Sequence, residues 1–183
     1  MKELSLNILD ITENSVKAGA DLTEILLREA DNLLTLVIRD NGCGMDAQTV
    51  EKVTDPFYTT RTTRAVGLGL PLLKLEAQQT GGDVTVTSRD EKTYPDAHGT
   101  TVTATFHTDH IDCPPLGDLP ATVVTLVQGH PDTDFLYVHE RAGKEEVRLD
   151  TRELRAVLGE DVPLSSFEVL QWIQDALKEA YGE

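Results

Sequence analysis

The sequence predicts an α+β fold: a two-layer α/β sandwich with helices on one face of a mixed sheet, plus a small C-terminal α+β appendage. Three observations predict it. A helical apolar pattern opens the chain at residues 4–18, and two short β-branched runs follow at 22–28 and 33–39. A second helical pattern at 68–79 then precedes two alternating runs at 83–89 and 101–106. An order in which helices alternate with hairpins predicts a sheet whose one face is covered by the helices.

The first helix is predicted from apolar residues that recur at helical spacing, among them Leu4, Ile8 and Ile11, until Gly19 ends the pattern. A second, polar stripe follows the same spacing, which places its members on one face of the helix. These members are Glu3, Asn7, Asp10, Asn14 and Lys17.

The runs at 22–28 and 33–39 are separated by Glu-Ala-Asp-Asn, which predicts an antiparallel hairpin that ends at Asp40. Asp46 is a plausible N-cap for a short helix over 47–53, which Asp55-Pro56 would end. Residues 57–66 are polar and show no sustained period, so they are predicted to form a loop or lid.

The next helix, 68–79, is predicted to stop at Gly81-Gly82, and residues 90–99 are predicted to join the two following strands. We therefore expect a first domain at 1–108. Three prolines in the next stretch predict a linker at 109–120, and a small α+β domain of unknown role would occupy 121–183.

In that last part, residues 121–128 are apolar and of uncertain type, and 135–139 and 145–149 flank a predicted hairpin turn. Two helices follow, each predicted to start at a capping box: Asp150 with Glu153, and Ser165 with Glu168. No residue in this part stands out as catalytic.

The composition is strongly acidic, with 16 Lys and Arg against 32 Asp and Glu and a formal charge of −16. This charge repels nucleic acid and anionic lipid, so neither is an expected partner. No apolar stretch is long enough to span a membrane and the N-terminus lacks a signal peptide, which predicts a cytoplasmic protein. Cys43 and Cys113 are then expected to be thiols.

Two glycine-containing segments are the strongest functional signal. In Asp40-Asn-Gly42-Cys-Gly44 a carboxylate at a strand end could accept a hydrogen bond from an adenine amino group, while the glycines admit a flat base. In Gly67-Leu68-Gly69 bare backbone N–H groups stand at a helix start, where phosphate is favoured. Alone, Asn-Gly could be a simple hairpin turn. Together the segments predict an ATP site, for which Lys17, Arg61, Arg64 and Lys74 are the available cations.

The order of these segments resembles the GHKL superfamily of ATP-binding domains, which includes DNA gyrase, heat-shock chaperones, histidine kinases and mismatch-repair ATPases. The resemblance rests on Asp10…Asn14…Lys17, Asp40…Gly44, Asp55-Pro-Phe57-Tyr-Thr-Thr-Arg61, Gly67-Leu-Gly69 and Gly99-Thr100-Thr101, and covers roughly the first 108 residues. It implies the Bergerat ATP-binding fold, with ATP and magnesium as ligands. The run from Pro56 to Arg61 is especially similar to histidine kinases.

The resemblance also implies residue roles. Asn14 would coordinate magnesium held by the phosphates, and Lys17 would meet phosphate. Asp10 matches the acid that activates water in the hydrolysing members of the family, which usually carry Glu at this position. Asp is one methylene shorter than Glu, so its carboxylate reaches less far toward a water molecule.

In the remaining segments, Asp40 would bind the adenine amino group, with Gly42 and Gly44 beside the base. Phe57 would lie at the base of the lid and Arg61 would face the phosphates, while Gly67, Leu68 and Gly69 would form the second glycine box. Thr100 or Thr101 would help to hold the adenine aspartate.

Three functions follow from this resemblance. We expect no dimerisation helix with an acceptor histidine upstream, so the first hypothesis is a stand-alone kinase-type ATPase acting on a protein in trans: a response regulator, an anti-anti-sigma-like protein or a redox-linked protein. The alternative is an ATP-dependent switch without phosphoryl transfer. A mismatch-repair-like ATPase is third, and the acidic charge argues against it.

Two further clusters carry weaker signals. His107-Thr-Asp-His110-Ile-Asp-Cys113 contains metal-ligand residue types but matches no defined zinc spacing. Cys43 lies inside the predicted adenine loop and is expected to be an ordinary small thiol.

Overall fold

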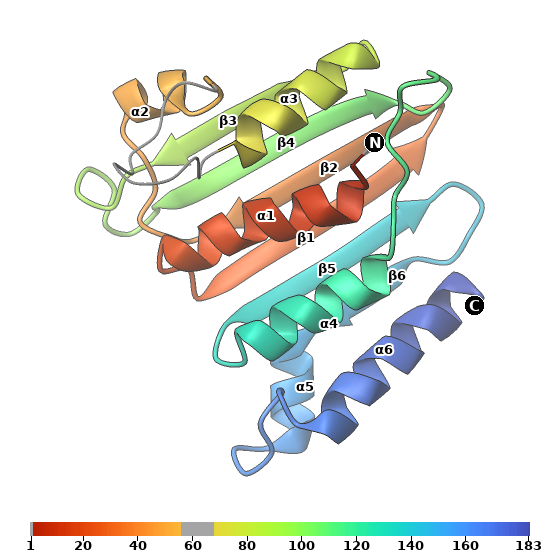
Figure 1. The fold of residues 1–183 in the computed structure, drawn as a ribbon. Helices are drawn as coiled ribbons and strands as arrows, with labels where there is room; N and C mark the ends of the chain where they lie inside the picture. Colours follow the sequence, from red (N-terminus) through yellow and green to blue (C-terminus); the bar gives the residue numbers. More distant parts are fainter. Residues whose placement is uncertain (1, 56–67) are drawn as a thin grey trace.

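A computed structural model describes residues 2–55 and 68–183. Its elements are α1 (Leu4–Lys17), β1 (Leu22–Ala30), β2 (Leu33–Asp40), α2 (Ala47–Lys52), α3 (Gly69–Gln79), β3 (Val84–Arg89), β4 (Gly99–His107), α4 (Leu119–Gly129), β5 (Asp134–Arg141), β6 (Val147–Asp150), α5 (Thr151–Leu158) and α6 (Phe167–Tyr181). Figure 1 shows α1, α3, α4 and α6 lying across one face of a sheet. The predicted α+β sandwich is confirmed.

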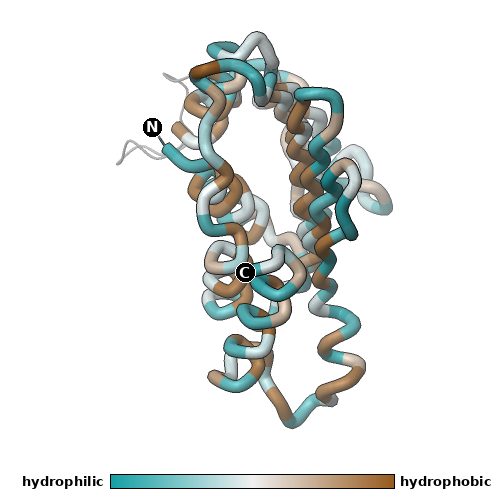
Figure 2. The backbone as a smooth tube through the Cα atoms, turned by 90° about the vertical axis from the view of Figure 1, so that its right-hand side faces the viewer, coloured by the Kyte–Doolittle hydropathy of each residue, from teal (hydrophilic) through white to brown (hydrophobic). Residues whose placement is uncertain are grey.

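The sheet has six strands in the order β3-β4-β2-β1-β5-β6. Four neighbouring pairs are antiparallel, and β1 pairs with β5 in parallel, from Leu22 opposite Asp134 to Glu29 opposite Arg141. The sheet is therefore mixed, as predicted. Viewed from the side, α1, α3, α4 and α6 form one layer and the strands the other (Figure 2).

The parallel pairing joins the C-terminal segment to the first part of the chain. Although residues 121–183 have the predicted α+β content, their hairpin β5-β6 extends the same sheet. Local patterns indicate that a strand exists, but its partner across more than a hundred residues depends on tertiary packing. The division into domains at 1–108 and 121–183 stays a prediction.

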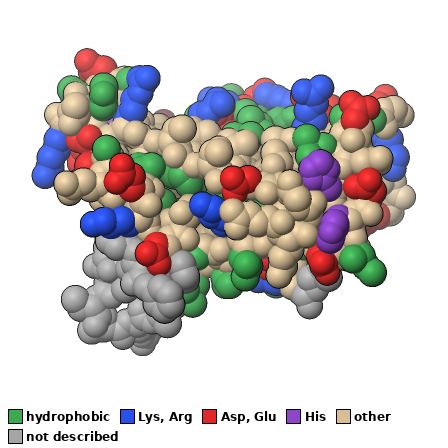
Figure 3. Space-filling view, turned by 90° about the horizontal axis from the view of Figure 1, so that it is seen from above, with side chains coloured by type: hydrophobic (Ala, Val, Ile, Leu, Met, Phe, Trp, Pro, Cys, Tyr) green, Lys and Arg blue, Asp and Glu red, His purple; other side chains and the backbone are tan. Residues whose placement is uncertain are grey.

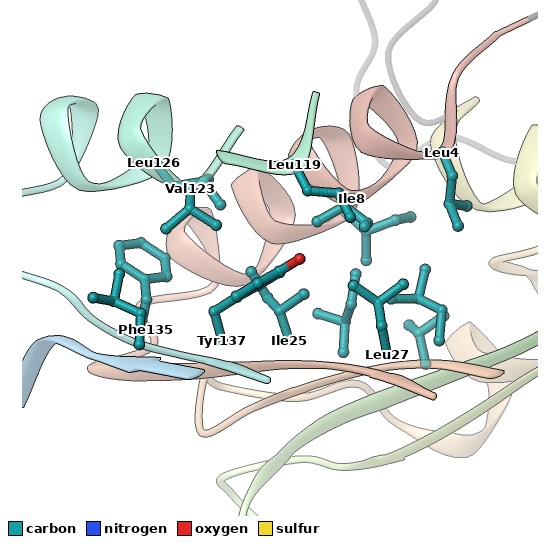
Figure 4. Close-up of a cluster of buried hydrophobic side chains, with 14 of the residues drawn as sticks. Leu4, Ile8, Ile25, Leu27, Leu119, Val123, Leu126, Phe135 and Tyr137 are labelled. Atoms are coloured by element: carbon teal, nitrogen blue, oxygen red, sulfur yellow. The ribbon is translucent and has the colours of Figure 1, made fainter. Parts of the chain in front are cut away.

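One hydrophobic core runs under the helices. Leu4 and Ile8 of α1 and Val123 and Leu126 of α4 point toward Ile25 and Leu27 of β1 and Phe135 and Tyr137 of β5 (Figure 4). The aromatic rings of β5 and the aliphatic side chains of β1 thus share one buried cluster. This packing fixes α1 and β1 relative to each other, and α1 carries part of the candidate site.

The segment predicted as a linker is ordered along α1. The backbone N–H groups of Leu4 and Ser5 donate to the carbonyls of Pro115 and Leu116, each at 2.9 Å. Pro120 lies inside the first turn of α4, where a missing N–H has no cost, so the helix begins before the predicted linker ends. The apolar run of uncertain type at 121–128 is thus helical.

Most predicted helix ends are confirmed. The Asp46 carboxylate accepts a hydrogen bond from the Thr49 N–H at 2.8 Å, and Asp150 accepts one from the Arg152 N–H at 3.0 Å. The predicted capping box at Ser165 is wrong, because α6 starts after Ser166, and no side-chain bond caps that position. The described helices include none long and apolar enough to cross a lipid bilayer.

Candidate functional site

The Asp40 carboxylate is the centre of the candidate site. It ends β2, and strand alternation places its side chain on the same face as buried Leu36 and Ile38, beneath the helices. Ser15 Oγ donates to Asp40 Oδ2 at 2.7 Å. The N–H groups of Gly42 and Thr100 donate to Oδ1 at 2.9 and 3.3 Å. Three donors from three elements therefore hold the carboxylate in one orientation.

The loop after β2 is anchored on both sides. The Cys43 N–H donates to the carbonyl of Ala18 at the end of α1, at 2.9 Å. On the other side, His98 Nδ1 lies 2.5 Å from the Gly42 carbonyl oxygen, and the Glu91 N–H donates to the Cys43 carbonyl at 2.9 Å. The loop thus bridges α1 and the β3-β4 connection.

Both glycines of this loop are required by close contacts with protein. A Cβ on Gly42 would lie 2.9 Å from Ala18 Cβ, and one on Gly44 would lie 1.9 Å from the Arg89 carbonyl oxygen. Gly44 also has a φ of +69°, which favours glycine. These glycines are predicted to lie beside the adenine base. The structure adds a second reason for them, namely that the backbone must pass close to α1 and β3.

Of the two predicted threonines, Thr100 is the one that contacts Asp40. Thr100 opposes Asp40 in the β2-β4 register, while Thr101 opposes Arg39 and alternates to the other face. Thr100 reaches Asp40 through its backbone N–H, and its hydroxyl shares a 2.8 Å hydrogen bond with Ser88 Oγ. Ser88 Oγ also accepts from the Met45 N–H at 2.8 Å. The threonine hydroxyl therefore orders the glycine loop indirectly.

The polar stripe of α1 divides into exposed and buried members. Asp10, Asn14 and Lys17 are exposed, as expected for groups that meet a ligand. Asp10 forms an ion pair with Lys2, with 2.6 Å between Oδ2 and Nζ. Asn7 is instead buried, and its Nδ2 donates to Glu76 Oε2 of α3 at 2.5 Å. Asn7 belongs to the same predicted polar face, but α3 packs over it and buries it.

The start of α3 lies beside Asp10. A Cβ on Gly69 would be 3.6 Å from Asp10 Cβ and 3.7 Å from Ile11 Cδ1, so this residue contacts α1. Leu68 is the exposed N-cap and makes no side-chain cap bond. The other predicted residues of the lid and second glycine box, Phe57, Arg61 and Gly67, lie outside the described residues.

Three participants were missed by sequence reasoning: Ser15, Ser88 and His98. Ser15 is buried and lies four residues after buried Ile11, so a serine at a core-facing helical position was the available signal. Ser88 and His98 had no local signal, because their partners at residues 42, 45 and 100 are distant in sequence or lie in an irregular loop.

The fit of a divalent cation can be judged from the donor atoms. The described residues contain no group of three or more His, Cys, Asp or Glu side chains placed to hold a metal ion. Asn14 offers one exposed carboxamide, for which no hydrogen bond is found among the described residues. A single neutral oxygen suits magnesium, which keeps several waters and binds through nucleotide phosphates. The residues present thus fit a nucleotide-borne magnesium ion and do not form a metal cage of their own.

Comparisons with known proteins agree with this geometry. Residues 2–110 match the family described as histidine kinase-, DNA gyrase B-, and HSP90-like ATPase. The sensor histidine kinase WalK of Bacillus subtilis is 36% identical over 109 residues, covering 54% of this chain and 17% of the relative. The signal transduction histidine-protein kinase AtoS of Escherichia coli is 33% identical over 88 residues, covering 48% of this chain and 14% of the relative. The chain thus spans about one-sixth of these relatives or less.

Among solved structures, the N-terminal domain of a DNA repair protein superposes with a TM-score of 0.61 and 17% identity, covering 87% of this chain and 58% of that chain. This likeness concerns the fold. Because it covers 87% of the chain, it includes much of the chain beyond residue 110, where the family match ends.

Proposed function

Since the chain belongs to the histidine kinase-, DNA gyrase B- and HSP90-like ATPase family, we propose that it binds Mg·ATP at the candidate site and transfers the γ-phosphate to a protein partner. Its curated relatives are named as sensor histidine kinases, which supports phosphoryl transfer over other ATP-driven activities. The adenine would lie against Asp40, and the phosphates would extend along α1 toward the start of α3.

The observation that carries the proposal is the hydrogen bonding of Asp40. An ionised carboxylate has about four lone-pair sites, and Ser15, Gly42 and Thr100 use three of them. The remaining acceptor capacity suits one N–H donor, such as the amino group of adenine. Because the other three donors fix the carboxylate, the adenine would meet a preorganised acceptor.

The phosphate end would use the exposed residues of α1 together with the residues before α3. Asn14 would bind the magnesium ion and Lys17 would neutralise phosphate charge. The backbone at Gly67, Leu68 and Gly69 would bind phosphate oxygens, Arg61 would face the γ-phosphate, and Phe57 would lie beneath the lid. When bound, magnesium supplies charge neutralisation for the phosphates.

The phosphoacceptor is proposed to lie on another protein, because the histidines of this chain are poorly placed for transfer. His139 is fully buried, and His98 and His130 contact the Gly42 carbonyl and the Glu13 carboxylate. His107 is the last residue of β4 and His110 lies in the turn after it, and both are exposed. None of the five histidines lies on an exposed helical face. We propose that the protein acts in a response-regulator pathway in the cytoplasm.

The test combines binding with transfer. Asp40→Asn should weaken Mg·ATP binding by about 100-fold or more in calorimetry, since an adenine-facing amide would place a donor against a donor. Asp46→Asn, which changes an acid in the α2 cap, is the matched control and should bind ATP normally. Unchanged affinity in Asp40→Asn would refute the adenine assignment. Radiolabelled γ-phosphate should then appear on a co-encoded partner.

An ATP-dependent switch is the second candidate, and the Asp10–Lys2 ion pair favours it. The ion pair holds the short Asp10 side chain against Lys2, and a carboxylate engaged in this way is poorly placed to activate water. If ATP binds tightly and no label reaches any partner, while ATP still changes a partner's affinity, the switch replaces the kinase.

A further inference from the structure

A hollow of about 320 Å³ lies next to the candidate site at the ends of β2, β3 and β4. Its lining includes the side-chain-bearing residues Arg39, Thr87, Arg89 and Thr101, together with His98 and Gly99 from the β3-β4 connection. Asp40, Ser88 and Thr100 of the candidate nucleotide site also line the hollow, and His98 anchors the loop of that site, whereas Arg39, Thr87, Arg89 and Thr101 have no role in it.

Strand alternation places this hollow on the sheet face opposite α1 and α3. Asp40, Ser88 and Thr100 face the helices, as the hydrogen bonds around Asp40 and Met45 show. Their neighbours in each strand, Arg39, Arg89 and Thr101, therefore point the other way.

The strand register aligns these residues in two neighbouring rows across β3, β4 and β2. Thr101 opposes both Arg39 and Thr87, so one guanidinium and two hydroxyls form a row across three strands. In the next row Arg89 opposes Gly99, whose lack of a side chain leaves the floor open. Adjacent strands are about 4.8 Å apart, so side chains from β2 and β3 can meet over β4.

The lining holds two arginines against one acid, Asp40, whose carboxylate faces the helices, in a chain whose formal charge is −16. Arg39 Nη1 donates to Glu24 Oε2 at 3.2 Å, which leaves its other N–H groups available. The Arg89 guanidinium lies 5.4 Å from the centre of the Tyr94 ring, and among the described residues it forms no ion pair. Two arginines concentrated in one hollow of an acidic protein indicate an anion as the ligand.

We propose that this hollow binds a phosphate group, either the free ion or a phosphomonoester. Arginine forks match phosphate oxygens, and threonine hydroxyls between the forks can donate to a tetrahedral anion from a further direction. A planar carboxylate would need only one fork. The volume lies at the small end of the range for ligand pockets, which suits a small phosphorylated group.

The hollow shares its backbone with the candidate nucleotide site. Thr100, which lines the hollow, donates its N–H to Asp40 on the other face, and Arg39 directly precedes Asp40. A phosphate bound here would therefore change ATP affinity, and ATP would change phosphate affinity by the same factor. This coupling rests on the proposed function, whereas phosphate binding itself does not.

The experiment is a titration of ¹⁵N-labelled protein with inorganic phosphate, without nucleotide or magnesium, followed by amide shifts. A parallel titration uses O-phosphoserine, and the tighter ligand tells a free ion from a phosphorylated group. Shifts are expected at Arg89, Gly99 and Thr101. The double variant R39Q R89Q should lose affinity about tenfold or more. R28Q, which removes a strand arginine that pairs with Glu140 outside the hollow, should keep it.

Several results would overturn the proposal. The first is the absence of a saturable shift with either ligand. The second is a set of shifts confined to α1 and the start of α3. The third is a loss of affinity in R28Q equal to that in R39Q R89Q. T87V T101V provides a second route if the arginine variant loses its native spectrum, and it should also weaken binding. If Asp40→Asn binds ATP normally, the nucleotide assignment fails while this titration still decides the phosphate site.

Discussion

Polar side chains are exposed in one region of the molecule and buried in hydrogen-bonded pairs in another. Around α1 and the end of β2, Asp10, Asn14 and Lys17 are exposed. At the junction of β1, β5 and α6, His139 is fully buried, and its two ring nitrogens lie 2.7 Å from Tyr181 Oη and from Glu29 Oε1. Figure 3 shows a further face on which acidic and basic side chains are scattered over the surface. Polar groups paired inside the fold stabilise it, and exposed ones remain available to ligands.

The buried network has a consistent hydrogen-bond direction. We assign the His139 Nε2–H as donor to Glu29, which leaves Nδ1 to accept from the Tyr181 hydroxyl. Tyr137 Oη, 2.5 Å away, then donates to Tyr181 Oη. Burial raises the pKa of Tyr181 to about 12 and raises the pKa of Tyr137, so both stay neutral donors. The network ties β1 of the family-matched part to β5 and α6.

The largest expected effect comes from breaking this network. His139→Leu should lower the free energy of unfolding by about 3 kcal/mol, because it removes a fully buried imidazole that is hydrogen-bonded to the partly buried Glu29 and Tyr181. Urea denaturation measures it, with His110→Leu in an exposed turn as the control, expected within about 0.5 kcal/mol of wild type. ATP affinity should not change. A His139→Leu protein of native stability would contradict the structural role.

The converse change at the site should affect binding and leave stability intact. Asn14→Ala should weaken Mg·ATP binding about tenfold, or about 1.4 kcal/mol, while metal-free ATP binding changes less. Its unfolding free energy should stay within about 0.5 kcal/mol of wild type, since Asn14 is exposed. Gln128→Ala, at an exposed position of α4, is the control. Equal losses with and without magnesium would argue against a metal role for Asn14.

A smaller effect concerns pH. Burial lowers the pKa of His139 below its ordinary value of 6.5, although the Glu29 carboxylate acts in the other direction. In the unfolded chain His139 takes up a proton near pH 6.5, whereas in the folded chain it stays neutral to a lower pH. Stability from neutral His139 is complete above pH 6.5 and falls as pH drops toward the folded pKa. Wild type should therefore lose stability more steeply than His139→Leu as the pH falls below 6.5, which urea denaturation at several pH values measures. Parallel curves for the two proteins would exclude this titration.

The smallest effect is expected at the Asp10–Lys2 ion pair. Both side chains are partly exposed, so Lys2→Met should change stability by less than about 0.5 kcal/mol. Any ATP hydrolysis should rise about twofold or more, because Asp10 loses the cation that neutralises it. Lys144→Met, in the β5-β6 turn, is the control. Slower hydrolysis in Lys2→Met would remove Asp10 as a candidate base.

Much of the candidate site could be predicted because its residues follow local rules. Asp40 ends an alternating run, Asp46 precedes a short helix, and Gly69 opens an apolar one, so each pattern is visible within a few residues. Ser15, Ser88 and the choice of Thr100 over Thr101 could not be predicted in the same way. They depend on strand register and helix packing, which bring together residues 12 to 60 positions apart.

By itself the sequence determined the family, the order of helices and strands and the main nucleotide-site candidates, because periodicity, caps and glycine segments are local properties of the chain. Only the tertiary structure decided that β5 pairs with β1, that Asn7 and His139 are buried, and that Arg39 and Arg89 share a hollow behind Asp40. These features arise from contacts between distant segments, whose free energy depends on the packed core and not on any short run of residues.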